Sequence, residues 1–208
     1  MNTVQATETV EQLNFKIFAI LNASTEPPRP VVVVAEMIAD YAIYLLPLVL
    51  AFLWLRGDPK LRSGLVSTFL AAELALLFNQ VIPLIWSHPR PFMVPLGNTL
   101  IQHAADSSFP SDHVTFMAAV SIGLWLYSGC RLIAVTTALL TVAVAWSRIY
   151  VGVHFPLDML GGVIVAIGAT LAIRPISGWI SSALMPKLFL PLYRRVFAIP
   201  ISVGPQRS

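Results

Sequence analysis

The sequence predicts an all-α protein: a polytopic membrane helical bundle of about five transmembrane helices, preceded by a short N-terminal interfacial helix. Only 11% of its 208 residues are charged and its mean hydropathy is +0.77, whereas about a quarter of the residues of a soluble domain are charged. Several apolar runs approach the roughly 20 residues that cross a bilayer as a helix. They lack the period-two alternation of a membrane barrel.

No internal repeat or long polar linker divides the chain, so we expect one domain over residues 1–208. Within it, residues 1–30 form an N-terminal interfacial segment. Apolar residues recur at helical spacing over residues 8–22, which is typical of a helix that lies on the membrane or against the bundle. Three prolines between residues 22 and 30 end this helix.

The helical core is expected over residues 31–173, and residues 174–208 form a basic C-terminal tail. Three of the five apolar segments are short and would need tilt or snorkelling of flanking arginines. Prolines interrupt the apolar pattern of the tail, so we expect it on a membrane surface rather than across the bilayer. The expected spans are residues 31–55, 65–86, 114–129, 132–146 and 155–173.

Lysine and arginine mark the cytoplasmic side of membrane proteins. Arg56, Lys60 and Arg62 follow the first expected span, and Arg131 follows the third. Five spans then place the loops over residues 87–113 and 147–158 on the outer face. The net charge of +3 therefore indicates topology and contact with anionic membrane lipids rather than binding to nucleic acid.

The two outer loops hold nearly all the polar residues of chemical interest. If a helix starts after Pro156, Asp158 can hold one imidazole nitrogen of His154 and leave the other free as a nucleophile. Arg90 and Arg148 offer planar guanidinium groups that suit phosphate oxygens. This combination predicts phosphoryl transfer through a phosphohistidine.

Two residues at the start of the third span extend this set. Ser111 precedes a helix start, where free backbone N–H groups favour an anion and where serine is also a preferred cap. His113 could exchange a proton with a leaving group or water. No metal and no other cofactor is expected, because His113, His154 and Asp158 are few ligands and the nearby arginines repel a cation.

Three stretches resemble the signature motifs of the type 2 phosphatidic acid phosphatase (PAP2) superfamily in order and loop placement: "RPF" at 90–92, "FPSDH" at 109–113 and "SRIYVGVHFPLD" at 147–158. Within it, the chain most resembles undecaprenyl-diphosphatases of the bacitracin-resistance type, because Asp112 stands where the wider superfamily usually has glycine. The resemblance implies metal-independent hydrolysis of undecaprenyl diphosphate to undecaprenyl phosphate and phosphate. It also implies a bacterial cytoplasmic (inner) membrane location, with the active site facing outward.

The resemblance implies a role for each motif residue. His154 would attack the terminal phosphorus, and Asp158 would orient it. His113 would protonate the departing undecaprenyl phosphate oxygen before it helps water to hydrolyse the phosphohistidine. The residues implied to bind the phosphate groups are Arg90, Ser111, Asp112, Ser147 and Arg148.

The first motif departs from the superfamily pattern at one position. A lysine usually lies seven residues before the arginine, but this chain has Pro83 there. His88, His103 and a site for the substrate's second phosphate are candidates to compensate for the missing cation.

Three carboxylates within the expected spans have no assigned chemistry. Glu36 and Asp40 share one face of the first span, and Glu73 falls near the middle of the second. Carboxylates in a bilayer are costly, so we expect all three to face the bundle interior. A further hypothesis is that Glu36 lines the entrance for the lipid headgroup.

Other functions remain open beside the expected lipid substrate and membrane-lipid partners. A phosphatidylglycerophosphate or phosphatidate phosphatase, or a phosphotransferase that acts on lipid A, would use the same motifs. An ion or proton transporter needs charges through the membrane depth or broken helices in repeated halves, whereas the motif residues here gather at one face. No motif indicates an oligomeric state.

Overall fold

The computed structural model describes residues 3–189, 191–192 and 195, with side chains described from residue 8 onward. Every regular element in this part of the chain is helical, which confirms the all-α prediction. The longer elements are α1 (Thr3–Leu21), α2 (Arg29–Tyr41), α3 (Leu45–Arg56), α4 (Pro59–Ile85), α5 (Asp112–Gly123), α6 (Arg131–Tyr150) and α7 (Pro156–Trp179). Two 3₁₀ turns, η1 (Ala42–Tyr44) and η2 (Pro91–Met93), and two π-helical segments, η3 (Leu124–Ser128) and η4 (Ile180–Phe189), complete the list.

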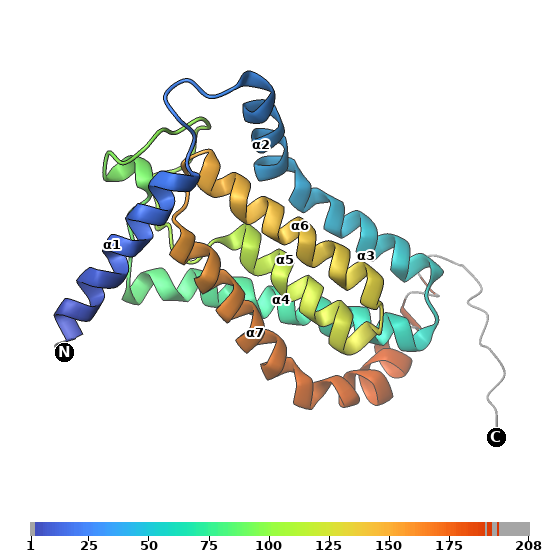
Figure 1. Cartoon of the computed structure of the whole chain (residues 1–208). Helices are drawn as coiled ribbons and strands as arrows, with labels where there is room; N and C mark the ends of the chain where they lie inside the picture. Colours follow the sequence, from blue (N-terminus) through green and yellow to red (C-terminus); the bar gives the residue numbers. More distant parts are fainter. Residues whose placement is uncertain (1–2, 190, 193–194, 196–208) are drawn as a thin grey trace.

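Helix α5 lies at the centre of the bundle and packs against α4, α6 and α7, while α2 packs on α6 and α3 on α4 (Figure 1). Small residues allow these close approaches. At Gly123, for example, an added Cβ would lie 2.8 Å from the Thr68 side chain of α4. Buried Leu124, Met117 and Val144 fill the space between the helices.

The chain is a multi-pass membrane protein. Within the described residues, four helical stretches are long and apolar enough to cross a membrane: Arg29–Arg56, Pro59–Ile85, Arg131–Tyr150 and Pro156–Phe189. Helix α5 and η3 together end at Ser128 and are shorter than the roughly 20 residues of a straight span. The count of five spans therefore stays a prediction.

Two boundaries differ most from those expected. Helix α4 starts at Pro59 instead of residue 65, because Asp58 caps it: its carboxylate accepts from the Leu61 N–H at 2.7 Å. Helix α7 has no end at residue 173. It continues to Trp179 and then as η4, whose Ile180 and Met185 are buried in one cluster with Val66 of α4.

The stretch up to residue 189 therefore packs against the bundle. The expectation that it lies on a membrane surface stays a prediction. Burial of apolar side chains against α4 outweighs the loss of a backbone hydrogen bond at a proline inside the helix. The expectation for residues 196–208 lies outside the described residues.

Glu73 does not face the bundle interior, contrary to expectation. Its side chain is exposed on the same outer face of α4 as Phe69 and Leu77. The inner face is occupied by fully buried Ala72 and Ala75, which let the neighbouring helices approach closely. A glutamate does not fit in that narrow space.

Helix α1 lies across the end of the bundle where the α4–α5 loop and the α6–α7 link are found (Figure 1). Its inner face buries Asn14 and Phe18. Its outer face exposes the apolar side chains Val10, Leu13, Ile17 and Ile20. The helix thus packs against the bundle as expected and presents an apolar face of the kind that lies in a membrane interface.

Candidate active site

The three motif segments meet at one end of the bundle, as expected from their order in the sequence. They enclose a cavity of about 370 Å³. His154, Arg90, Arg148 and His113 all line it, although they come from four different parts of the chain. The remaining lining residues are Asn79, Gln80, Pro83, Leu84, His103, Asp106, Ser107, Phe109, Pro110 and Asp112.

Asp158 is the most enclosed charged group of the site, with no exposed surface. Helix α7 begins at Pro156, which needs no hydrogen bond for its nitrogen at that position. Oδ2 of Asp158, in the first turn, accepts from the Phe155 N–H at 2.7 Å and from the Ser108 hydroxyl. His154 Nδ1 lies 3.2 Å from the same oxygen. A helix start and a returning loop therefore fix the carboxylate beside the histidine.

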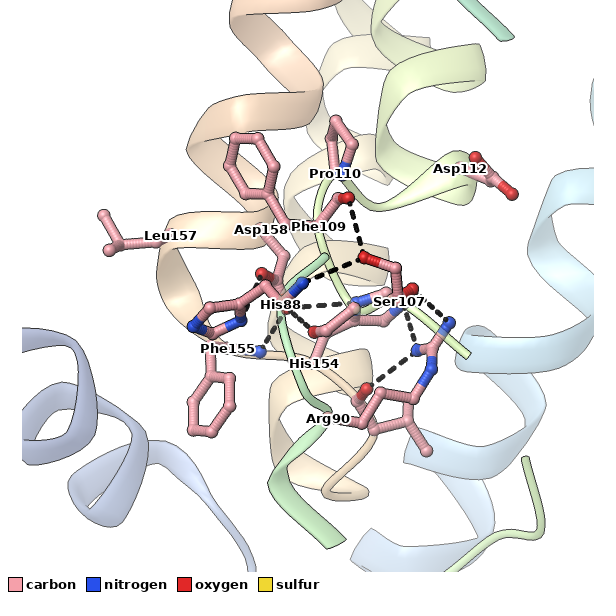
Figure 2. A network of polar contacts seen from close by, with 12 residues as sticks. His88, Arg90, Ser107, Phe109, Pro110, Asp112, His154, Phe155, Leu157 and Asp158 are labelled. Atoms are coloured by element: carbon pink, nitrogen blue, oxygen red, sulfur yellow. Dashed lines mark hydrogen bonds and ion pairs between the residues drawn. The ribbon is translucent and has the colours of Figure 1, made fainter. Parts of the chain in front are cut away.

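Arg90 holds the other side of the His154 ring (Figure 2). Its Nη1 lies 3.1 Å from His154 Nε2 and donates to the Val153 carbonyl at 2.9 Å, while its Nε donates to Asp106 at 2.8 Å. A guanidinium has only donors, so Nε2 accepts and Nδ1 carries the ring proton. The lone pair of His154 therefore lies on the nitrogen beside the arginine, where it accepts this hydrogen bond.

Burial keeps the His154 ring neutral. It lowers the pKa of His154 to about 4, against the hydrogen bond and charge of Asp158, which act in the opposite direction. The positive charges of Arg148 and Arg90 contribute to this lowering. The imidazole is thus uncharged, and its Nε2 carries no proton, at any pH near neutrality.

Arg148 enters the cavity from the last turn of α6 and is almost fully buried. Its Nη1 donates to the Ala39 carbonyl at 3.2 Å and lies 3.4 Å from Nε2 of His113. The Asp40 carboxylate is 3.8 Å away, which gives this residue a partner that the sequence did not indicate. The buried Nε of Arg148 has no partner among the described residues.

Several other residues expected at the site do not contact the His154 network. Asp112 lines the cavity but accepts from Asn79 Nδ2 at 2.8 Å and points away from the His154 network (Figure 2). The buried Ser147 hydroxyl donates to the Val144 carbonyl at 2.9 Å. The residues expected at the site but absent from the cavity lining are Asp158, His88, Ser111, Ser147 and Glu36.

Ser111 occupies the N-cap position of α5, but its side chain makes no capping hydrogen bond. Its buried hydroxyl has no partner in the described part of the chain. His103 does line the cavity, and its ring centroid is 6.2 Å from that of His154. Burial and the charge of Arg90 lower the pKa of His103, which leaves it a neutral hydrogen-bonding group at the rim.

Sequence reasoning missed the residues that support the site from the α4–α5 loop. Ser108 binds Asp158, and Asp106 binds Arg90. Burial alone would raise the pKa of Asp106, but the hydrogen bond and charge of Arg90 lower it. Both residues lie just before the "FPSDH" motif, but nothing in their spacing indicates which partners they meet.

Among the described residues, no group of three or more His, Cys, Asp or Glu is placed to hold a metal ion. Pro83, at the position of the usual superfamily lysine, forms a neutral part of the cavity wall. The positive charge in the cavity therefore comes from Arg90 and Arg148.

The chain is similar in sequence and fold to known proteins. The family model described as PAP2 superfamily matches residues 64–181. The putative undecaprenyl-diphosphatase YbjG of Escherichia coli is 36% identical over 202 residues, which cover 94% of this chain and 98% of that protein. Undecaprenyl-diphosphatase BcrC of Bacillus subtilis is 34% identical over 155 residues, covering 74% of this chain and 79% of that protein.

Two crystal structures share the fold. LpxE of Aquifex aeolicus superposes with a TM-score of 0.66 at 24% identity, covering 78% of this chain and 95% of that one. A PAP2-type phosphatidylglycerolphosphate phosphatase of Bacillus subtilis gives 0.60 at 20% identity, covering 86% and 89%. At these identities the likeness shows the fold alone.

Replacing Gly161 on α7 by alanine should reduce activity. An added Cβ would lie 2.1 Å from the Phe109 ring, so the loop that carries Ser108 would be pushed from Asp158. We expect a loss of turnover of about tenfold or more, since buried contacts this short force neighbouring groups to move. The control is Gly168→Ala on the same helix, where nothing lies within 4 Å. Equal turnover in the two variants would contradict this view of the loop.

The protonation of His154 can be followed by ¹⁵N NMR of histidine-labelled protein in detergent, with His154→Gln to assign its signals. Because its pKa is lowered to about 4, the ring should stay neutral as the pH falls from 7 to 5.5. An ordinary histidine, with a pKa of about 6.5, would be about 90% protonated at pH 5.5. A titration midpoint near 6.5 would show that the ring is not buried as described.

Proposed function

The chain belongs to the PAP2 superfamily, and we propose that it is an integral membrane phosphatase that hydrolyses undecaprenyl diphosphate to undecaprenyl phosphate and inorganic phosphate. The observation that carries the proposal is the neutral His154, whose Nε2 lone pair faces a cavity that contains two arginines. The undecaprenyl-diphosphatase names of the Escherichia coli and Bacillus subtilis relatives support the choice of substrate.

In the first step, Nε2 of His154 attacks the terminal phosphorus. A bond forms between nitrogen and phosphorus, and the bond from phosphorus to the bridging oxygen breaks, so undecaprenyl phosphate leaves with the electron pair. Arg90, 3.1 Å from Nε2, and Arg148 stabilise the negative charge of the transferring phosphoryl group. Asp158 accepts from Nδ1 at 3.2 Å and stabilises the positive ring of the phosphohistidine.

His113 acts as the general acid of the first step and the general base of the second. Its ring lies across the cavity, with Nε2 3.4 Å from Arg148. Burial and the charge of Arg148 keep this ring neutral in the empty site by lowering its pKa to about 3, so it takes up a proton when the negatively charged substrate binds. In the first step it gives that proton to the departing oxygen. In the second step it takes a proton from the water that attacks the phosphorus; the nitrogen–phosphorus bond breaks, phosphate leaves, and His154 regains its lone pair.

The proposed location is the bacterial cytoplasmic membrane, with the site facing outward. The α4–α5 loop and α6–α7 link carry the site at one end of the bundle, and the α3–α4 link and the start of α6 lie at the other end (Figure 1). That other end carries Arg56, Lys60, Arg62 and Arg131. Basic links are retained on the cytoplasmic side, which supports an outward-facing site.

Phosphate release tests the substrate directly. The detergent-purified protein, in excess EDTA, is given undecaprenyl diphosphate, phosphatidate or phosphatidylglycerophosphate. We expect preference for the diphosphate. His154→Ala should lower turnover by about a thousandfold or more, as for other covalent nucleophiles.

Three results would count against the proposal. Equal or faster turnover of the glycerophospholipids would overturn the substrate. Loss of activity in EDTA would overturn the metal-independent reaction. Turnover by His154→Ala at the rate of the unaltered protein would overturn the nucleophile.

A further inference from the structure

The second oxygen of the Asp158 carboxylate is buried and has no hydrogen-bond partner among the described residues. This atom, Oδ1, faces Nδ1 of His88 at 3.9 Å. Nδ1 of His88 is also buried and likewise has no hydrogen-bond partner in the described residues. Buried polar atoms nearly always have a partner, because leaving one unpaired costs the free energy of its lost hydration. Two such atoms that face each other point to a contact that belongs to the working site.

The other nitrogen of His88 reaches the N-terminal helix. Nε2 lies 3.2 Å from a carboxylate oxygen of Glu11 on α1. An ionised carboxylate only accepts, so Nε2 of His88 is the donor. A continuous series of side chains therefore runs from Glu11 through His88 and Asp158 to the reactive ring of His154.

His88 has little freedom to leave this position. Its backbone N–H donates to the Ser107 hydroxyl at 3.2 Å, and its carbonyl accepts from the Ser108 N–H at 2.7 Å. Its ring packs against Trp86 and Phe155, with centroids 5.4 and 5.5 Å away. The backbone segment that holds Asp158 through Ser108 thus also holds the imidazole opposite the free oxygen (Figure 2).

The form of the His88 ring decides what it does to Asp158. A neutral ring that donates from Nε2 to Glu11 would turn the lone pair of Nδ1 toward Asp158 Oδ1, and two acceptors repel. An imidazolium donates from both nitrogens and satisfies both carboxylates.

Helix α1 supports the same region by further contacts. Asn14 Oδ1 accepts from the Leu157 N–H at 3.0 Å. Phe15 and Phe18 pack against the Phe155 ring with centroids 5.2 and 5.1 Å away. The helix lies outside the residues that the family model matches, yet it contacts both neighbours of Pro156 at the start of α7.

We propose that Glu11 and His88 are positioning residues that hold the second oxygen of Asp158, so that the first oxygen stays on Nδ1 of His154 during phosphoryl transfer. Their effect on turnover rests on the proposed function. The N-terminal helix is then a working part of the site, since it supplies the charge that orients His88.

We call the series of contacts from Glu11 through His88 and Asp158 to His154 the relay. A series of variants in the full-length protein tests it. Glu11→Gln removes the charge, and Glu8→Gln, an exposed glutamate one turn earlier on the same helix, is the matched control. We expect Glu11→Gln to lower kcat about fivefold and His88→Gln about tenfold or more, each with KM within about twofold. The double variant should be no slower than His88→Gln alone, because both changes break one series of contacts.

Three results would overturn the relay. One is equal kcat in Glu11→Gln and Glu8→Gln. Another is a fold loss of kcat in the double variant that equals the product of the two single losses, which would mean that the two residues act independently. The third is a rise in KM with kcat unchanged. If His88→Gln does not fold, as judged by thermal unfolding, the Glu11→Gln and Glu8→Gln pair still decides.

A readout without substrate separates this proposal from the proposed function. The ¹⁵N signal of His154 Nδ1 should shift in Glu11→Gln and stay in place in Glu8→Gln. If the protein hydrolyses none of the lipids but shows this shift, the proposed phosphatase function is refuted and the positioning role of Glu11 and His88 is supported. An active enzyme with no shift would refute the relay alone.

Discussion

Burial of the Asp158 carboxylate at the start of α7 is the constraint on which the rest of the site depends. A charged carboxylate without exposed surface is stable only when hydrogen bonds replace its hydration. Its donors are the Phe155 N–H, the Ser108 hydroxyl and Nδ1 of His154. They come from the helix start and from a loop about fifty residues earlier in the sequence, so the α4–α5 loop must return to α7 for the carboxylate to be satisfied.

Charge balance around this carboxylate explains why the cavity suits an anion. Arg90 is paired with Asp106, and Arg148 lies near Asp40, whose side chain is 45% exposed. The neutral His154 ring lines the same cavity as the two arginines. The buried Nε of Arg148 has no partner among the described residues. A phosphoryl group in the cavity would bring acceptor oxygens to donors that are already in place, which is the arrangement that lowers the barrier to phosphoryl transfer.

Much of this architecture could be predicted from the sequence, because apolar runs and proline positions are local signals. The helical class, the N-terminal helix and the joining of three polar segments at one end are confirmed. Asp58 and Pro59 form an N-terminal cap of α4, which is a local signal in the sequence. The continuation of α7 beyond Arg174 and the outward position of Glu73 were missed, because both depend on how closely α4 approaches its neighbours.

The residues of the site also fall into those that could be predicted from the sequence and those that could not. His154, Asp158, Arg90, Arg148 and His113 could be found because motif spacing brings them together, although their catalytic roles stay predictions. The partners Ser108, Asp106, Asp40 and Glu11 could not be found. Their contacts span 50, 16, 108 and 77 residues of sequence, and no spacing rule reaches across such tertiary contacts.

The phosphohistidine is the central claim, and trapping it is the most direct test. The purified protein would be mixed with undecaprenyl diphosphate labelled with ³²P in the terminal phosphate and stopped with alkali within milliseconds. We expect label on the protein that resists alkali, is released by acid and maps to the peptide containing His154, with none in His154→Ala. Rapid phosphate release with no acid-labile label on His154, in the unaltered protein or in a variant at His113 that slows the second step, would contradict it.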